Sequence, residues 1–587
     1  MNPSSMNPSP KTFHGSWDGP SKIVLGIDIG TTQSGVAFTY LQEGVEKSIH
    51  RVVQWPGQES QNQQSKIPSM LWYDANNKAV SIGAEALTPQ AEEDAEDHHW
   101  RPAKHFKLHL HPEELIARHG LETDGLPDGV GISQVYTDFL RYLLQHTRTY
   151  FEDHILDGKH IWETYQPKME VVLAHPNGWS IREQSILRSA TVAAGFVDGK
   201  DADSRIHFVS EAEASVHFCI YHTNLGSQLK TGITFAVCDA GGSTVDTTVY
   251  SVETTAPLRL AETRASACVQ AGAIFVDAAA KSYLKQVLKN AEISPEDVEE
   301  YVSRGVKDFE SNAKRAFRDT TAGDLSIAIA GTRFNNPSIR ARRGRMNVPG
   351  DAVKRLFDFC IDQIIGSVES QLESTAASYI LLVGGFGESL YLREQLKSRF
   401  EPRGCQITTT NDATSKAVAD GALVWFCSSN VTKRAPRFSY GIEIFVPYNS
   451  SIQAHKRRKT IFWPSGQFAR GGWSQIVSKG DPIDCNTVIR RPYYREYSSP
   501  NPDLTRFKEV IWCYSLSGSP EWMRFKPGSL MPGFKSHKTA SGSSYWSLSF
   551  NVCIHFGRTE LEAFLEWTEN GVVHTGPARI VSTTELA

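Results

Sequence analysis

Residues 22–38 hold the feature that most constrains the fold, a turn of glycine and polar residues between two apolar runs. Two β-prone runs around such a turn predict a β-hairpin, in which glycine lets the backbone approach a ligand and threonine adds donors beside it. Asp28 ends the first run, where a buried carboxylate is costly unless it serves a cation. The turn consists of Gly30, Thr31, Thr32 and Gln33. We predict a hairpin that grips phosphate and positions a hydrated metal ion; an ordinary hairpin with an Asp-capped turn is the alternative.

The same pattern returns at residues 235–250. An apolar run ends in Asp239, a glycine-rich turn follows, and a second apolar run begins at Val245. The turn contains Gly241, Gly242, Ser243 and Thr244. One such hairpin is a weak signal, but two in order, each with an aspartate and about a domain length apart, indicate a repeated functional unit.

The pair of hairpins resembles the two phosphate loops of the superfamily that contains actin, sugar kinases and the heat-shock-protein-70 ATPases. The resemblance implies two α/β lobes around a cleft for ATP or ADP with Mg²⁺. In that arrangement the hairpins clamp the phosphates, and Asp28 and Asp239 hold the metal through water, because Mg²⁺ dehydrates reluctantly. Closure of the lobes on ATP and reopening after hydrolysis implies a two-state switch.

The resemblance also implies three residues that orient the attacking water. The catalytic lysine of the family falls on Lys104, with Lys107 as the alternative. The carboxylate that contacts metal-bound water falls on Glu211, with a solvent-facing Glu213 as the alternative. Thr244 of the second turn is the third residue.

On the adenosine side of the implied cleft, the family has glycine turns and a basic helix. Here Tyr379–Val383 predicts a buried strand that breaks into a Gly-Gly turn, a place where backbone approaches a ligand. The matching residues are Gly272, Lys314, Arg315, Gly384, Gly385 and Phe386.

These motifs, in order over residues 22–428, identify the chain as an atypical member of the heat-shock-protein-70 family, near its divergent heat-shock 70 kDa protein 12 branch. Three departures bear on activity. Ser243 replaces a third glycine and adds a side chain beside the phosphates, and Gln33 replaces an aromatic residue. Residues 386–388 lack an arginine that stacks on the base. We expect nucleotide binding to survive these changes and hydrolysis to be slow.

A chain of 587 residues is too long for one core. Alternating strands and helices predict an α/β fold of two actin-like lobes, a duplicated ribonuclease-H-like unit, followed by a smaller β-rich region. Helices are predicted over residues 133–155, 181–194, 276–288, 351–373, 390–400 and 414–427, and one or two more from 295 to 317. The expected segments are a disordered tail at 1–21, lobe I at 22–210, lobe II at 211–430 with the chain returning between lobes, and a β-rich domain at 431–587.

Composition and charge indicate which kinds of molecule the protein does not bind and in which cellular compartment it lies. A net charge of −4 gives no reason to expect nucleic-acid binding, and no run of about 18 apolar residues predicts a membrane span. The N-terminal segment lacks the apolar core of a signal peptide, and nine scattered cysteines without a C-x-x-C pair predict reduced thiols. We expect a cytoplasmic protein, with a nuclear location also open. The five histidines between His98 and His111 have no recognised ligand spacing, and we expect them on the surface.

Kinship with chaperones implies that residues 431–587 bind client polypeptides or co-chaperones. Two other functions remain open for the same fold. One is a small-molecule kinase of the sugar-kinase type, although no kinase-specific signature is present. The other is a nucleotide sensor or scaffold that binds ATP without turnover. An actin-like filament protein is a further alternative, against which the added β-rich region argues.

Overall fold

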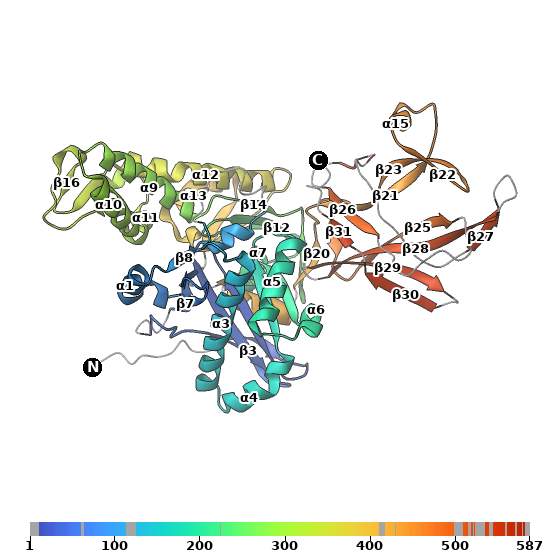
Figure 1. Ribbon diagram of the computed structural model, residues 1–587, viewed down its shortest axis with the longest axis horizontal. Helices are drawn as coiled ribbons and strands as arrows, with labels where there is room; N and C mark the ends of the chain where they lie inside the picture. Colours follow the sequence, from blue (N-terminus) through green and yellow to red (C-terminus); the bar gives the residue numbers. More distant parts are fainter. Residues whose placement is uncertain are drawn as a thin grey trace. The chain divides into compact units, whose positions relative to one another are not determined.

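The computed structural model describes residues 11–59, 64–112, 125–222, 225–409, 417–428, 430–497, 509–514, 518–520, 522, 535–538, 544–557, 560–569, 572–577 and 579–581. The chain divides into two compact units, and Figure 1 labels many of their elements. Unit 1 comprises Met1–Leu258 and Ser266–Asn430, and unit 2 comprises Arg259–Ala265 and Val431–Ala587.

The first sheet of unit 1 contains the first predicted hairpin. Its strands are ordered β1-β4-β3-β2-β9-β10, and β5 pairs with β3. The hairpin is confirmed, because β2 and β3 pair antiparallel with Asp28 opposite Gly35. The strands are β1 (Lys11–Ser16), β2 (Lys22–Ile29), β3 (Gln33–Leu41), β4 (Glu46–Arg51), β5 (Lys66–Pro68), β9 (Glu170–His175) and β10 (Ile206–Ser210).

The second sheet contains the second predicted hairpin, which is also confirmed by the antiparallel pairing of β11 and β12. Strands β12-β11-β18-β19 repeat the arrangement of β3-β2-β9-β10, since an antiparallel hairpin is followed by two parallel neighbours in both sheets. The two turns therefore follow equivalent strands. The strands are β11 (Thr234–Ala240), β12 (Val245–Thr255), β14 (Ala267–Val269, paired with β12), β18 (Tyr379–Val383) and β19 (Gln406–Thr409).

Helices cover both faces of the first sheet. Alternate residues of β2 point to opposite faces, so Leu25 and Ile27 join a core with α3 and α5, whereas Val24 joins a core with α7 and α14. The helices are α3 (Ile132–His154), α5 (Ile181–Ala194), α7 (Glu211–His222) and α14 (Ala417–Ser428). The α3 and α5 predictions are confirmed to within a residue; the expected start of α14 at 414 lies outside the described residues.

A second group of helices packs with the second sheet in one large core. Helix α10 begins as its sequence predicts, because the Ser294 hydroxyl accepts a hydrogen bond from the backbone N–H of Asp297. This group contains α9 (Ala273–Lys289), α10 (Pro295–Asp308), the π-helical turn η5 (Phe309–Ala313), α11 (Lys314–Ala316), α12 (Gly350–Leu372) and α13 (Leu390–Phe400). A small sheet beside it contains β15 (Leu325–Ala328), β16 (Ala341–Arg342) and β17 (Arg345–Val348).

The N-terminal segment corrects one expectation. Residues 11–16 form β1, which pairs antiparallel with β4 and buries Phe13 against the first sheet, so the predicted disordered tail does not extend to residue 21. Residues 1–10 lie outside the described residues.

Unit 1 also contains β6 (Met70–Tyr73), β7 (Ala79–Ile82), β8 (Arg101–Lys104), η1 (Glu85–Leu87), η2 (Phe106–Leu110), α1 (Pro89–Asp97), α4 (Gly158–Tyr165), α6 (Ala202–Arg205) and α8 (Leu225–Gln228).

Unit 2 contains two five-stranded sheets that share a core. Their orders are β22-β23-β21-β26-β31 and β25-β28-β29-β30, with β27 on β28. Ile442 and Ile511 of one sheet and Phe550 and Val552 of the other lie in the same apolar cluster. These strands are β21 (Ser439–Pro447), β22 (Thr460–Trp463), β23 (Gly466–Val477), β25 (Val488–Tyr497), β26 (Val510–Tyr514), β27 (Lys535–Lys538), β28 (Ser544–Gly557), β29 (Glu560–Glu569), β30 (Val572–Pro577) and β31 (Arg579–Val581). Unit 2 also holds β20 (Val431–Arg434), β24 (Ile483–Asp484), α15 (Gln453–Lys456) and, except for Leu258, the strand β13 (Leu258–Glu262).

Across the described ranges, every helix is too short or too polar to cross a lipid bilayer.

Helices α7 and α14 cross at a point that only glycine fits. A Cβ at Gly421 of α14 would overlap the backbone carbonyl of Ala214 in α7. Backbone cannot move aside as a flexible side chain does, so the close approach of the two helices depends on this glycine.

We predict that Gly421→Ala destabilises the protein by about 1–3 kcal/mol, because the added methyl group forces the two helices apart. Gly366→Ala on α12 is the matched control, since its Cβ would meet open space and alanine stabilises an exposed helix by ~0.5–1 kcal/mol. Urea denaturation of both variants measures the difference. Equal midpoints for the two variants would contradict the tight helix crossing.

Candidate functional site

The turns of the two hairpins touch each other. The Thr31 and Ser243 hydroxyl oxygens lie 2.7 Å apart in a buried hydrogen bond. A Cβ at Gly242 would lie 3.3 Å from the Thr32 hydroxyl oxygen, so the second turn approaches the first with its backbone. Ser69 supports the first turn, because its hydroxyl donates to the Gly30 carbonyl and its N–H donates to the Thr32 carbonyl. Sequence segments more than 200 residues apart therefore form one site.

Ser243 is also held from a second side by His111. Trp179 donates its indole N–H to His111 Nδ1 at 2.9 Å, which leaves the proton of a neutral ring on Nε2. His111 Nε2 lies 3.3 Å from the Ser243 hydroxyl and can donate to it. Burial, with the nearby Lys107 charge, lowers the pKa of His111 to about 3, so the ring is neutral at physiological pH. His111 is 2% exposed, which corrects the expectation that all five histidines of its cluster lie on the surface.

Helix α9 begins against the second turn. The N–H groups of Gly272, Ala273 and Ile274 donate to the carbonyls of Ser243, Gly241 and Gly242, at 3.1, 3.2 and 2.9 Å. These bonds satisfy three of the four donors that a helix N-terminus leaves unpaired. A Cβ at Gly272 would overlap the Gly242 backbone, so a glycine is required at this contact.

Three carboxylates lie near the turns, of which Asp28 and Asp239 are buried and Glu211 is 13% exposed at its side chain, and two lysines accompany them. The Lys107 ammonium lies 2.5 Å from Glu211, the first residue of α7. The Lys66 ammonium lies 2.6 Å from Asp28 at the end of β2. Asp239, on β11, accepts a hydrogen bond from the Ser215 hydroxyl at 2.9 Å. Thr244, the remaining predicted catalytic residue, is buried in the second turn.

The negative charge of this cluster is only partly balanced. Burial raises the pKa of Asp239 to about 7, and the Glu211 and Asp28 charges add to the effect. Burial acts to lower the pKa of Lys107, but the negative charges of Glu211 and Asp28 outweigh this effect. The pKa of Lys107 therefore lies above its usual value. A group of carboxylates with excess negative charge suits a hard, hydrated cation such as Mg²⁺. Asp28 and Asp239 therefore fit the metal that the resemblance implies. Within the described residues, no group of three or more His, Cys, Asp or Glu side chains forms a direct metal-ligand cluster.

The structure brings Lys107, the alternative, to the carboxylates and leaves Lys104 on the surface. Lys104 is exposed at the end of β8, where the alternation of the strand turns it away from the buried Ala103. The chain then turns through His105, which has a φ of 49°, into η2, and this turn carries Lys107 into the interior. Glu213 is fully buried rather than solvent-facing, and Glu211 is the acid that meets the lysine.

The glycines after β18 pack beside the second turn. Gly384 has a φ of 82°, and a Cβ there would overlap Ala240 and the Asp239 carboxylate. Gly385 has open space where a Cβ would lie. The Phe386 side chain packs against Phe357 in the core, so we remove Phe386 from the candidate ligand-binding residues.

The predicted basic helix contributes one buried ion pair. The Lys314 ammonium lies 2.7 Å from the carboxylate of Asp277 on α9. Burial raises the pKa of Asp277 to about 6, although the Lys314 charge acts to lower it. Arg315 is exposed and has no hydrogen bond or ion pair with the other described site residues, so the structure does not bring it into the site. Gln33 is likewise exposed at the start of β3.

Five residues of this site escaped the sequence analysis: Lys66, His111, Trp179, Ser215 and Asp277. A β5 strand opposite the first turn could have drawn attention to Lys66, because strand register places it two strands from Asp28. The other four have no local signal, since their partners come from distant parts of the chain.

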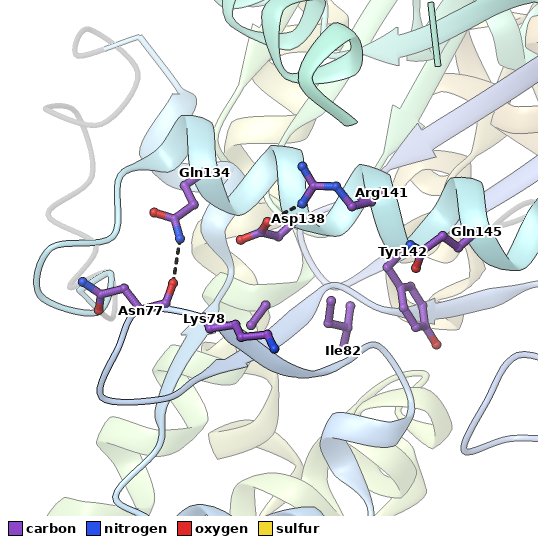
Figure 2. A pocket seen from close by; sticks show the side chains of 9 residues that line it. Asn77, Lys78, Ile82, Gln134, Asp138, Arg141, Tyr142 and Gln145 are labelled. Atoms are coloured by element: carbon purple, nitrogen blue, oxygen red, sulfur yellow. Dashed lines mark hydrogen bonds and ion pairs between the residues drawn. The ribbon is translucent and has the colours of Figure 1, made fainter. Parts of the chain in front are cut away.

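A separate pocket of about 460 Å³ lies between the turn before β7 and helix α3 (Figure 2). Its lining includes an ion pair of Arg141 with Asp138 and a hydrogen bond from Gln134 to the Asn77 carbonyl. None of the predicted phosphate-site residues lines this pocket, so it is a different surface from the site at the two turns.

Three known proteins that resemble this chain are all of one type. The chain is 21% identical to human heat shock 70 kDa protein 12B over 555 residues, covering 80% of this chain and 78% of the relative. It is 22% and 21% identical to mouse and human heat shock 70 kDa protein 12A over 552 residues, covering 80% of this chain and 79% of each relative. All three relatives are heat shock 70 kDa proteins of the 12A and 12B type, which supports the interpretation of this chain as an atypical heat-shock-protein-70-like protein. No model of a protein family matches it.

This heat-shock-protein-70-like chain combines helices with several sheets, which is consistent with an actin-like ATPase fold. The alignment reaches well beyond the two turns, because it covers four fifths of the sequence. At this identity most side chains differ, so each site residue must be judged from its own contacts.

We predict that Lys107→Gln destabilises the protein by about 3–5 kcal/mol, because it leaves Glu211 as a buried charge without its partner. Lys104→Gln is the control and changes stability by less than about 0.5 kcal/mol, since Lys104 is exposed. Urea denaturation of the full chain measures both. The double variant Lys107→Gln with Glu211→Gln recovers part of the loss; no recovery would contradict the pairing.

Proposed function

We propose that this protein binds ATP and ADP at the two touching turns and hydrolyses ATP slowly. The observation that carries the proposal is the meeting of two glycine turns, each of which follows a buried aspartate on an equivalent strand. Similarity to these relatives supports it, because the chain aligns with heat shock 70 kDa proteins over most of its length.

The phosphates are proposed to bind between the turns, where glycine backbone and threonine hydroxyl groups supply donors. Residues 22–210 and 211–430 act as two lobes that contribute one turn each, and α14 of the second segment returns to pack on the first sheet. The open space at Gly385 and the Lys314–Asp277 pair lie on the elements that we assign to the adenosine half.

Hydrolysis requires a positioned water molecule and compensation of negative charge. Lys107 and Glu211 hold each other in a fixed ion pair, so together they can orient a water molecule through one donor and one acceptor. Thr244 adds a hydroxyl group in the second turn. A Mg²⁺ ion held through water by Asp28 and Asp239 supplies positive charge to the phosphate oxygens when bound.

Ser243 accounts for the proposed slow turnover. Its hydroxyl bonds Thr31 across the turns and lies within reach of His111, so a phosphate that enters between the turns has to replace the bond between Thr31 and Ser243. A glycine at this position would leave that space open.

Unit 2 is proposed to contact client polypeptides or co-chaperones. Its sheet carries Phe462, which is 76% exposed on β22, and Phe445 and Trp463, whose rings contact each other beside it. All nine cysteines fall in the described ranges and none forms a disulfide, which supports a reducing compartment such as the cytoplasm.

We predict that Gly385→Leu weakens binding of Mg·ADP at least tenfold, or by about 1.4 kcal/mol, because the side chain fills open space that we assign to the adenosine half of the ligand. Gly366→Leu on α12 is the control, since both glycines have open space around a Cβ and neither has a positive φ. Calorimetry on the full chain gives the affinities. Absence of Mg·ADP binding to the unsubstituted protein at millimolar concentration, or equal affinities for both variants, would contradict the proposed site.

The polypeptide-binding role of unit 2 predicts that Phe462→Ser weakens binding of a permanently unfolded, reduced and carboxymethylated protein. Each lost aromatic anchor costs an interface of this kind about 1–2 kcal/mol, or roughly five- to thirtyfold in affinity. Phe359→Ser removes a phenylalanine that is 48% exposed on α12 of unit 1 and serves as the control. Equal affinity of the two variants in fluorescence anisotropy would contradict the role.

A further inference from the structure

Strand register brings Lys66 to Asp28 across the first sheet. Asp28 on β2 is directly opposite Gly35 on β3, and Gly35 is directly opposite Lys66 on β5. The three residues form one cross-strand row in which the lysine and the aspartate are two strands apart. The Lys66 ammonium nevertheless lies 2.6 Å from the Asp28 carboxylate, so its side chain crosses the intervening strand.

Gly35 makes this crossing possible. A Cβ at Gly35 would lie 3.3 Å from Lys66 Cγ and 3.8 Å from Lys66 Cε, so the lysine stem lies directly over the glycine. Any larger residue at position 35 would push against the stem. The sequence therefore holds a glycine at the one place that lets a lysine of β5 reach the aspartate of β2.

Lys66 supplies positive charge to the whole carboxylate cluster. Its charge opposes the effect of burial on the pKa of both Asp239 and Glu211. The side chain is 15% exposed and that of Asp28 is 5% exposed, so solvent screens the pair only weakly. Asp28 is one of the two aspartates that fit the hydrated Mg²⁺ ion, and Lys66 already donates to one of its oxygens.

We propose that Lys66 is a resident counter-ion that competes with Mg²⁺ for Asp28, so that nucleotide binding to this chain depends only weakly on Mg²⁺. The inference rests on the proposed nucleotide site and assigns to it a determinant of metal dependence. An ammonium group places one charge where a divalent ion would place two, and it is present before any ligand binds. Without the Lys66 ammonium group, nucleotide binding at this site requires Mg²⁺.

The first arm of the test uses Mg²⁺ alone, without nucleotide. An ion that binds only the folded state raises the melting temperature. We expect 10 mM MgCl₂, compared with KCl of equal ionic strength, to leave the melting temperatures of the unsubstituted protein and of Lys66→Arg unchanged and to raise that of Lys66→Gln. Lys168→Gln, which removes an exposed lysine, is the control and behaves as the unsubstituted protein. Equal shifts in all variants would overturn the proposal, whether or not nucleotide binds.

The second arm measures ADP affinity by calorimetry with saturating Mg²⁺ and with EDTA. We expect the two affinities of the unsubstituted protein to differ by less than about threefold and those of Lys66→Gln by more than about tenfold. A loss of more than about tenfold in EDTA for the unsubstituted protein would overturn the proposal even if Lys66→Gln does not fold. Absence of ADP binding in every condition would instead refute the nucleotide site, and the Mg²⁺ arm would still decide the role of Lys66.

Discussion

The meeting of three carboxylates at one largely buried point is the constraint on which the rest of this site depends. Asp28 and Asp239 are buried and the Glu211 side chain is 13% exposed, and like charges held together with so little solvent are costly unless cations or hydrogen bonds balance them. Lys66 and Lys107 supply two ammonium groups, each with its own route into the interior. Burial, together with the remaining negative charge, raises the pKa of Asp239 to about 7.

The turns above this cluster show how backbone contacts replace side-chain contacts at a crowded point. Gly272 and Gly384 each bring a main chain against a neighbouring loop or strand where a side chain would collide, and a Cβ at Gly242 would lie 3.3 Å from the Thr32 hydroxyl oxygen. The N–H groups at the start of α9 are used by the second turn itself, so that helix fixes the shape of the turn. Ser243 is the exception among these residues, because its side chain joins the two turns instead of leaving space between them.

Local patterns in the sequence predicted the two hairpins and the helices at 133–155 and 181–194, because apolar periodicity and turn chemistry act within a few residues. They favoured Lys104 over Lys107, but one left-handed residue at His105 decides which lysine enters the interior, and it is Lys107. They missed His111 and Trp179, whose contact with Ser243 joins segments that are far apart in the chain. The contact of Lys66 with Asp28 depends on the pairing register of three strands, and no single segment of the sequence encodes that register.

A crystal structure of the full chain with ADP and Mg²⁺ tests the central claim most directly, that the two glycine turns are the phosphate site. The account predicts that the diphosphate lies between residues 30–33 and 241–244, that the bond between the Thr31 and Ser243 hydroxyl groups is broken, and that the adenosine lies beside Gly385. Nucleotide bound elsewhere, for example in the pocket of Asp138 and Arg141, with the two turns still in contact, would contradict it.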